Sequence, residues 1–159
     1  MLKTRKTWRE KLEKTPGLPK VVDIPPKMVK RFGTGKMLIP RPLDVDALIR
    51  KVKKGKLVTQ AQIRKRLAQD FHVDCACPIT TGIFIWIAAG AAEEDRREVK
   101  RQITPYWRVI KPDGSLNEKF PGGTKAQAAS LRREGQRIQP SKGKKPPRVK
   151  DFEKSLQKL

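Results

Sequence analysis

The sequence predicts a mostly α-helical domain that carries one small β hairpin, and three observations support this fold class. Apolar residues recur with helical spacing through the middle of the chain. The helical segments begin near Asp, Thr or Pro and two of them are followed by Gly, which are the usual signals of helix ends. Residues 107–110 have strand composition, and Pro112-Asp-Gly is a turn signal. Helix, short helix, longer helix and then hairpin is the order of a winged helix-turn-helix domain.

Each predicted helix has its own boundary signals. The first has Asp at its start and Lys at its end, which complements the helix dipole. A Thr that precedes a helix is a good N-cap, and Pro is well placed at a first helical position. The predicted helices are 43–52 ended by Gly55, 60–68 capped by Thr59, 79–99 with Pro78 at its first position, and 125–134 capped by Thr124 and ended by Gly135.

The domain is expected at residues 43–138, between a basic, proline-rich N-terminal arm at 1–42 and a basic tail at 139–159. Trp8 and Leu12 stand four apart and predict a short helix in the arm. The prolines at 16, 19, 25 and 26 exclude regular helix between them. We expect the rest of the arm to wrap the core in extended form, and residues 140–147 to be a flexible linker before a short last helix at 151–157.

The charge balance points to a polyanionic partner. Lys and Arg number 38 against 16 Asp and Glu, a net charge of +22 with a pI near 10.5. That balance disfavours an enzyme of small molecules alone and favours DNA, RNA or an acidic membrane surface. The longest apolar run, 79–92, is too short to span a membrane, and no signal peptide is visible, so we expect a soluble, cytoplasmic protein, nucleoid-associated if bacterial, with no membrane partner.

The segment from Pro105 to Gly135 carries a family resemblance. It resembles the DNA-binding domain of the methylated-DNA–protein-cysteine methyltransferases (alkylguanine-DNA alkyltransferases), whose active-site motif is PCHRV, followed by a double Gly and a helix that ends in Leu-x-x-Glu-Gly. Upstream, residues 55–59, Ile63 and Pro78 resemble the family's helix-turn-helix, so the likeness covers about 43–138. The matching residues are Pro105, Arg108, Val109, Gly122, Gly123, Leu131, Glu134 and Gly135.

The motif departs from the family at its chemically active positions. Tyr106 stands where the family has the Cys that accepts the alkyl group, and Trp107 stands where it has a His. A phenol with a pKa near ~10 is a far poorer nucleophile than an activated thiolate. Glu134 fits the family's supporting carboxylate but has no His to orient. We therefore expect no alkyl transfer at this site, and no catalytic residue is assigned.

A branch of the family, the alkyltransferase-like proteins, has Trp in place of the Cys and binds alkylated guanine without repairing it. By that resemblance, Tyr106 is an aromatic wall of a lesion pocket, where a flipped base would be held by stacking. Two positions depart from the family's base-flipping residues: Gly82 replaces an Arg on the groove-facing helix, and Gln60 replaces a Tyr. Backbone contacts to a duplex depend less on these positions.

The Cys and His residues offer a weak metal motif. His72, Cys75 and Cys77 supply three ligands at an unusual spacing, whereas zinc needs about four. The alternative is two buried thiols and a turn His, and we expect no metal and no cofactor.

The expected function is non-enzymatic binding of double-stranded DNA by a monomer, with alkylated guanine as a possible target and DNA repair proteins as further partners. Two alternatives stay open: an active alkyltransferase that uses Cys75 or Cys77, and an RNA- or ribosome-associated basic protein. The residues expected at the DNA are Gln60, Thr80, Thr81, Gly82, Tyr106, Arg108, Lys111, Lys119 and Lys125.

Overall fold

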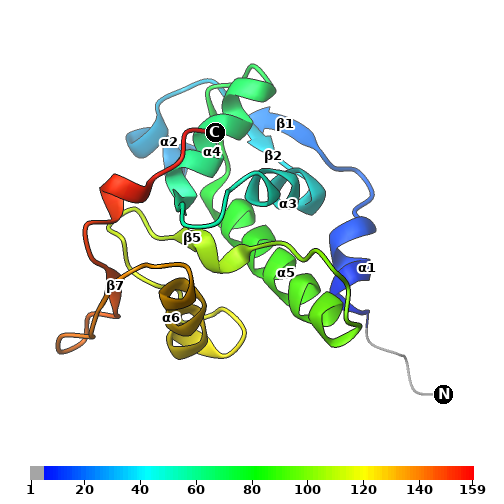
Figure 1. Cartoon of the computed structure of the whole chain (residues 1–159). Helices are drawn as coiled ribbons and strands as arrows, with labels where there is room; N and C mark the ends of the chain where they lie inside the picture. The colour runs from blue at the N-terminus through cyan, green and yellow to red at the C-terminus, as the bar shows by residue number, and fades with distance from the viewer. Residues whose placement is uncertain (1–5) are drawn as a thin grey trace.

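The computed structural model describes residues 6–159, so the first five residues of the predicted arm lie outside it. Six helices and several short strands form a mixed, mainly helical fold (Figure 1). The helices are α1 (Trp8–Glu13), α2 (Pro26–Phe32), α3 (Pro42–Arg50), α4 (Gln60–Asp70), α5 (Pro78–Arg97) and α6 (Gly123–Arg133), with short 3-10 helices η1 (Tyr106–Arg108) and η2 (Phe152–Ser155).

The strands form three small sheets. In the first, the order is β1-β2-β4, with β1 antiparallel to β2 and β2 parallel to β4. The second is a parallel pair that joins β3 to β5, and the third is an antiparallel hairpin of β6 and β7. The strands are β1 (Lys20–Asp23), β2 (Lys36–Ile39), β3 (Val58–Thr59), β4 (Cys75–Ala76), β5 (Val109–Ile110), β6 (Ile138–Gln139) and β7 (Arg148–Val149).

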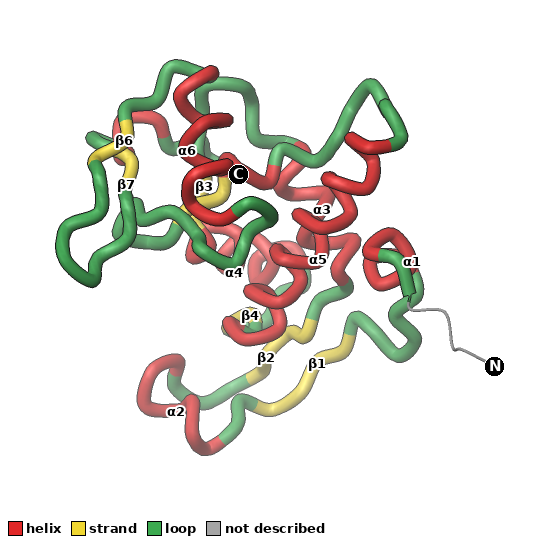
Figure 2. The backbone as a smooth tube through the Cα atoms, turned by 90° about the horizontal axis from the view of Figure 1, so that it is seen from below, coloured by secondary structure: helices red, strands yellow, loops and turns green. Residues whose placement is uncertain are grey.

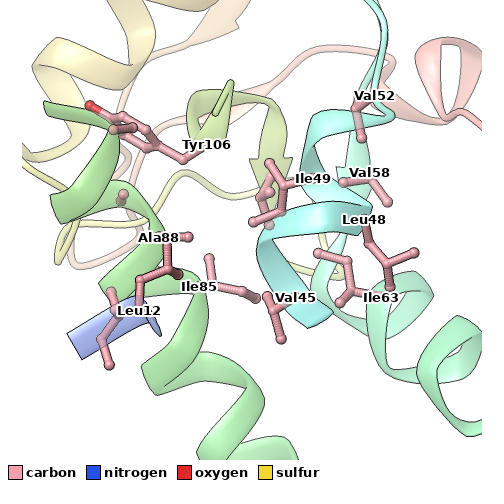
Figure 3. Packing of buried hydrophobic residues seen from close by; sticks show 14 of the residues in the cluster. Leu12, Val45, Leu48, Ile49, Val52, Val58, Ile63, Ile85, Ala88 and Tyr106 are labelled. Atoms are coloured by element: carbon pink, nitrogen blue, oxygen red, sulfur yellow. The ribbon is translucent and has the colours of Figure 1, made fainter. Parts of the chain in front are cut away.

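The main core lies around α5, the longest helix, which packs against α1 and α3 (Figures 1 and 3). The buried apolar face of α5 meets Val45 and Ile49 of α3 and Leu12 of α1. A Cβ on Gly90 of α5 would collide with the indole ring of Trp8, so this glycine lets α1 lie directly on α5. The predicted helices at 43–52, 60–68 and 79–99 are confirmed as α3, α4 and α5.

The N-terminal arm is more regular than the sequence predicts. The helix expected near Trp8 and Leu12 is confirmed as α1. A helix, α2, begins at Pro26, and the strands on either side of it, β1 and β2, form an antiparallel pair (Figure 2). The arm also supplies Leu12 and Leu38 to the main core, where both are fully buried. The boundary between residues 42 and 43 stays a prediction.

The expected hairpin after Pro105 does not form. Residues 106–108 are a 3-10 helix, and β5 pairs in parallel with β3. The chain turns back after β5, where the Lys111 amide donates to the Ser115 carbonyl, but Ser115 then bridges Arg148 rather than β5. The Pro112–Gly114 turn is present, because the amide of Gly114 donates to the carbonyl of Lys111. A two-residue strand such as β5 can form only a few interstrand hydrogen bonds, and here it forms them with the neighbouring strand β3 rather than across the local turn.

Two further expectations at the C-terminal end are wrong. α6 begins at Gly123 with Gly122 as its N-cap, so Thr124 lies inside the helix rather than capping it. Residues 138–149, expected to include a flexible linker, form the β6–β7 hairpin, and a 3-10 helix replaces the predicted last helix. Among residues 6–159, no helix is both long and apolar enough to cross a membrane.

Candidate nucleic-acid interface

An open groove of about 880 Å³ runs between α5 and the segment that follows the Pro112–Gly114 turn. One wall is the exposed face of the first half of α5, and the other is the loop at 117–119 with Lys111. The residues that line it are Gln60, Ile79, Gly82, Ile83, Trp86, Lys111, Asn117, Glu118 and Lys119. This volume lies within the range of ~300–1,000 Å³ that is usual for ligand sites.

The α5 wall is apolar and exposed. Ile79, Ile83 and Trp86 are 55%, 46% and 40% exposed, and they are three of the five large apolar side chains that stand out in this way among the described residues. Their spacing of four and three residues puts them on one face of the helix. Exposed apolar residues that gather in one groove mark an interaction site rather than chance exposure.

The helices around the groove are fixed by their caps and by the N-terminal arm. Thr59 caps α4 and forms a capping box with Gln62, in which each side chain satisfies the other residue's amide, and this positions Gln60 at the groove. Trp8 of α1 meets Trp86 edge to face, with 4.5 Å between the ring centroids. The arm therefore supports one end of the groove.

The opposite wall is held by a buried amide. The Gln127 side chain of α6 is buried and donates to the carbonyls of Trp107 and Val109 at 3.1 and 2.9 Å. Its oxygen accepts from the Asn117 amide at 2.8 Å. Two segments, residues 107–109 and the loop at Asn117, are therefore tied to α6 by one side chain. At the groove, Lys111 pairs with Glu118 at 3.1 Å, while Lys119 is exposed.

The guanidinium of Arg108 is hydrogen-bonded to other groups of the protein. Its guanidinium donates to both carboxylate oxygens of Glu134, at 2.9 and 2.6 Å, and to the carbonyl of Val52 at 2.6 Å. Burial alone would raise the pKa of Glu134, but the hydrogen bonds and the charge of Arg108 outweigh burial and hold this pKa below its ordinary value. Glu134, the carboxylate expected to support a catalytic motif, therefore anchors Arg108.

Tyr106 is a core residue and does not border the groove. Only 5% of it is exposed, and it lies with the buried residues of the main core (Figure 3). Its ring packs edge to face against Trp107 and Phe120. The hydroxyl donates to Glu93 of α5 at 2.7 Å. Burial, and then the hydrogen bond and charge of Glu93, raise the pKa of Tyr106 well above its ordinary value of 10. An aromatic wall of a lesion pocket would need an open face, which this ring lacks.

Tyr106 is the one tyrosine of the chain, so its ionisation can be followed directly. We expect no tyrosinate absorbance as the pH rises through the ordinary value near 10, because the folded pKa is raised. The contribution of the Tyr106 hydroxyl to the free energy of unfolding is complete below its pKa in the unfolded chain and is lost as the pH rises above that value. Ionisation of Tyr106 should therefore coincide with unfolding. An ultraviolet pH titration, run beside circular dichroism, measures both. A reversible tyrosinate signal in folded protein would mean an exposed ring.

The three residues of the weak candidate metal motif do not come together. His72 is exposed in a turn, whereas Cys75 and Cys77 are buried free thiols in a small cluster with Ile24 and Met37. Within residues 6–159, no three His, Cys, Asp or Glu side chains are grouped as metal ligands. Burial is also the main reason that the pKa of the Cys75 thiol is raised, which leaves less of the reactive thiolate.

The structure brings together only part of the predicted DNA-binding set. Gln60, Gly82, Lys111 and Lys119 line the groove, and Thr80 is half-buried in the first turn of α5. The other four do not line the groove. Lys125 is exposed on α6, Thr81 and Tyr106 are buried, and Arg108 is hydrogen-bonded to Glu134.

The sequence reasoning missed the apolar residues of the groove. Ile79, Ile83 and Trp86 belong to a helix half that is apolar on all sides, which predicted burial rather than exposure. Hydrophobic periodicity cannot tell the exposed face of such a helix from its buried ones. Asn117 and Glu118 gave no signal beyond their position next to Lys119.

Comparison with known proteins finds a solved structure of similar fold. The chain is similar to S. pombe Atl1, an alkyltransferase-like protein whose crystal structure is a complex with damaged DNA containing O6-carboxymethylguanine. The TM-score is 0.50, with 16% sequence identity, over 74% of this chain and 94% of that chain. The chain has an Atl1-like fold. No protein-family model and no curated protein matches it.

The Atl1-like fold agrees with the helical part of the resemblance drawn from the sequence. In this chain the degenerate motif lies at η1, between α5 and α6. At 16% identity the likeness extends to the fold alone, so the role of each groove residue has to be argued from the groove itself.

Proposed function

We propose that this protein binds double-stranded DNA through the groove between α5 and residues 111–119, without modifying the DNA. The observation that carries the proposal is the pairing of an exposed apolar helix face with lysines on the facing wall, in a chain of net charge +22. Lysines hold the phosphates of a duplex, and apolar side chains such as Ile79 and Ile83 can act as wedges between base steps in the minor groove.

Alkyl transfer is not part of the proposal. The position of the acceptor thiol holds a buried phenol with a raised pKa, and both thiols of the described residues are buried in another cluster. A nucleophile has to reach the alkyl carbon, and neither group is open to it. Incubation with alkylated duplex should therefore add no mass to the protein.

Recognition of alkylated guanine is a second candidate, and the groove itself favours it. Its size suits an extrahelical base, and Trp86 offers an aromatic surface at one end. The structural relative Atl1 was crystallised with such a lesion. The buried ring of Tyr106 is the observation against it, so plain duplex binding comes first, and DNA repair partners belong to this second candidate only.

The experiment compares the wild-type chain with Ile83→Glu on a labelled duplex of roughly two helical turns. Ile83 is exposed, so the substitution leaves the core intact, yet it puts a negative charge where the proposal puts DNA. We expect a loss of affinity of about five- to thirtyfold, measured by fluorescence anisotropy at fixed salt, since one charge opposed to phosphate costs on the order of 1–2 kcal/mol.

Val99→Glu is the matched control, because Val99 is exposed just beyond α5 and the charge change is the same. Equal losses in both variants would overturn the groove as the binding site. Competition by alkylated against plain duplex decides the second candidate: equal competition removes lesion recognition. Stronger binding of structured RNA than of duplex DNA would replace the proposal by the RNA alternative.

A further inference from the structure

The β6–β7 hairpin concentrates positive charge. Between Gln136 and Lys150 the chain has six basic residues and no acidic one, and all six side chains are exposed. The hairpin projects from the body of the molecule, where Figure 1 draws it in orange. Its basic residues are Arg137, Lys142, Lys144, Lys145, Arg148 and Lys150.

The hairpin has a fixed shape. Ile138 and Gln139 pair with Val149 and Arg148, and nearer the tip the backbones of Lys142 and Lys145 bond to each other in both directions. Three prolines at 140, 146 and 147 restrict the backbone between these two pairings. The tip lysines are therefore held on a strand pair and a tight turn rather than on a loose tail.

The base of the hairpin is anchored to the segment that forms the groove wall. The Val149 amide donates to the carbonyl of Gly114, and the Leu116 amide donates to that of Pro147, each at 2.9 Å. Val149 is fully buried, and Phe152 packs so closely over Gly114 that a Cβ there would collide with its ring. Gly114 also has a positive φ of 87°, which suits glycine. The hairpin and the groove wall thus form one unit.

The cations of the hairpin are not neutralised by ion pairs among the described residues. In the part of the chain that the structure describes, no carboxylate lies within ion-pair distance of any of the six cations, whereas Arg50, Arg66, Arg96 and Arg108 each have one. Arg148 lies over the ring of Phe152, at 5.8 Å. The tip itself has no large exposed apolar side chain, so it offers charge without apolar contact area.

We propose that the β6–β7 hairpin is a second nucleic-acid contact, which grips the phosphate backbone of the duplex beyond the groove. This inference rests on the proposed function and extends it to a part of the chain outside the helix-turn-helix. A rigid array of unpaired cations with no apolar surface suits a sequence-independent polyanion, and a protein or membrane partner would need apolar area as well. Because the groove wall holds the hairpin, both can act on one duplex.

The test replaces three tip lysines together, in the variant Lys142→Gln/Lys144→Gln/Lys145→Gln. Each lost phosphate contact lowers the slope of log K against log salt by about 0.9, so we expect the slope to fall by about two to three and the affinity at ~0.1 M salt to fall about tenfold or more. The matched control is Lys20→Gln/Lys27→Gln/Lys30→Gln. It removes the same charge from exposed positions on β1 and α2, which lie away from the hairpin in Figures 1 and 2.

The outcomes separate the two proposals. If the wild-type chain binds no duplex, the proposed function fails. If it binds and both triple variants change the slope equally, the hairpin acts only through net charge and this inference is overturned. If the salt slope on duplex DNA falls more in the hairpin variant than in the control variant, the inference stands. The same loss confined to structured RNA would overturn the duplex as the partner. Thermal melts check that both variants keep the wild-type stability, as exposed positions should.

Discussion

Arg108→Ala is expected to lower the free energy of unfolding by about 3–5 kcal/mol, because it leaves Glu134 buried without its partner. The two side chains are 13% and 8% exposed, and their bidentate contact excludes most of the water that would solvate a lone carboxylate. The substitution also removes the donor to the carbonyl of Val52. Urea denaturation followed by circular dichroism measures the loss.

The companion variant tests whether the pair itself is needed. In Arg108→Met/Glu134→Leu both charges are gone and the volume is roughly kept, so the stability should recover much of the loss. A loss in the double variant as large as in Arg108→Ala would mean that the Val52 contact, rather than the unpaired charge, causes the effect. The substitution Arg66→Ala, at a half-buried residue whose partner Asp70 is exposed, should cost less than about 1 kcal/mol.

The same ion pair predicts a pH dependence. The pKa of Glu134 is lower in the folded than in the unfolded chain, so its contribution is complete above the unfolded value near ~4.3 and is lost as the pH falls below it. In Arg108→Met/Glu134→Leu this acid-sensitive part of the stability should be missing. An equal loss below that pH in the wild-type chain and the double variant would assign the acid sensitivity to other carboxylates.

The helices could be predicted because their signals are local. Thr59 at the N-cap of α4 and Pro78 at the start of α5 mark helix ends within one or two residues, and helical spacing found α3 and α1. The strands could not be found in this way. A two-residue pairing such as β3 with β5 joins positions about fifty residues apart and depends on how the helices pack first.

The site was harder to predict than the fold for two physical reasons. A motif match says which residue occupies a position but not whether its side chain is accessible to a ligand. Tyr106 replaces a motif residue and is buried, whereas Arg108 matches one and is paired with Glu134. Conversely, composition predicted that residues 140–147 are flexible, because prolines, glycine and lysines are typical of linkers. Backbone pairing with Gly114 and Leu116 is a long-range effect that composition does not carry.

Tyr106→Ala is the second change with a large expected effect, a loss of about 3–5 kcal/mol in the free energy of unfolding. The ring fills a space between Trp107, Phe120 and α5, and its removal leaves a cavity that these rigid neighbours cannot close. Tyr106→Phe keeps the ring and loses only the hydrogen bond to Glu93, which still has Arg96 at 3.1 Å. The expected cost of that variant is about 0.5–1.5 kcal/mol.

The pair of variants also decides between a core role and a lesion-binding role for this ring. If Tyr106 is a core residue, Tyr106→Phe binds plain and alkylated duplex as the wild-type chain does, and folded Tyr106→Ala keeps the wild-type salt slope, because the phosphate contacts come from lysines at the groove and the hairpin. If the ring is instead a wall for a flipped base, Tyr106→Ala retains its stability and loses binding to alkylated duplex alone. The two roles thus predict losses in different measurements, since a buried ring stabilises the fold and an open one stabilises the complex.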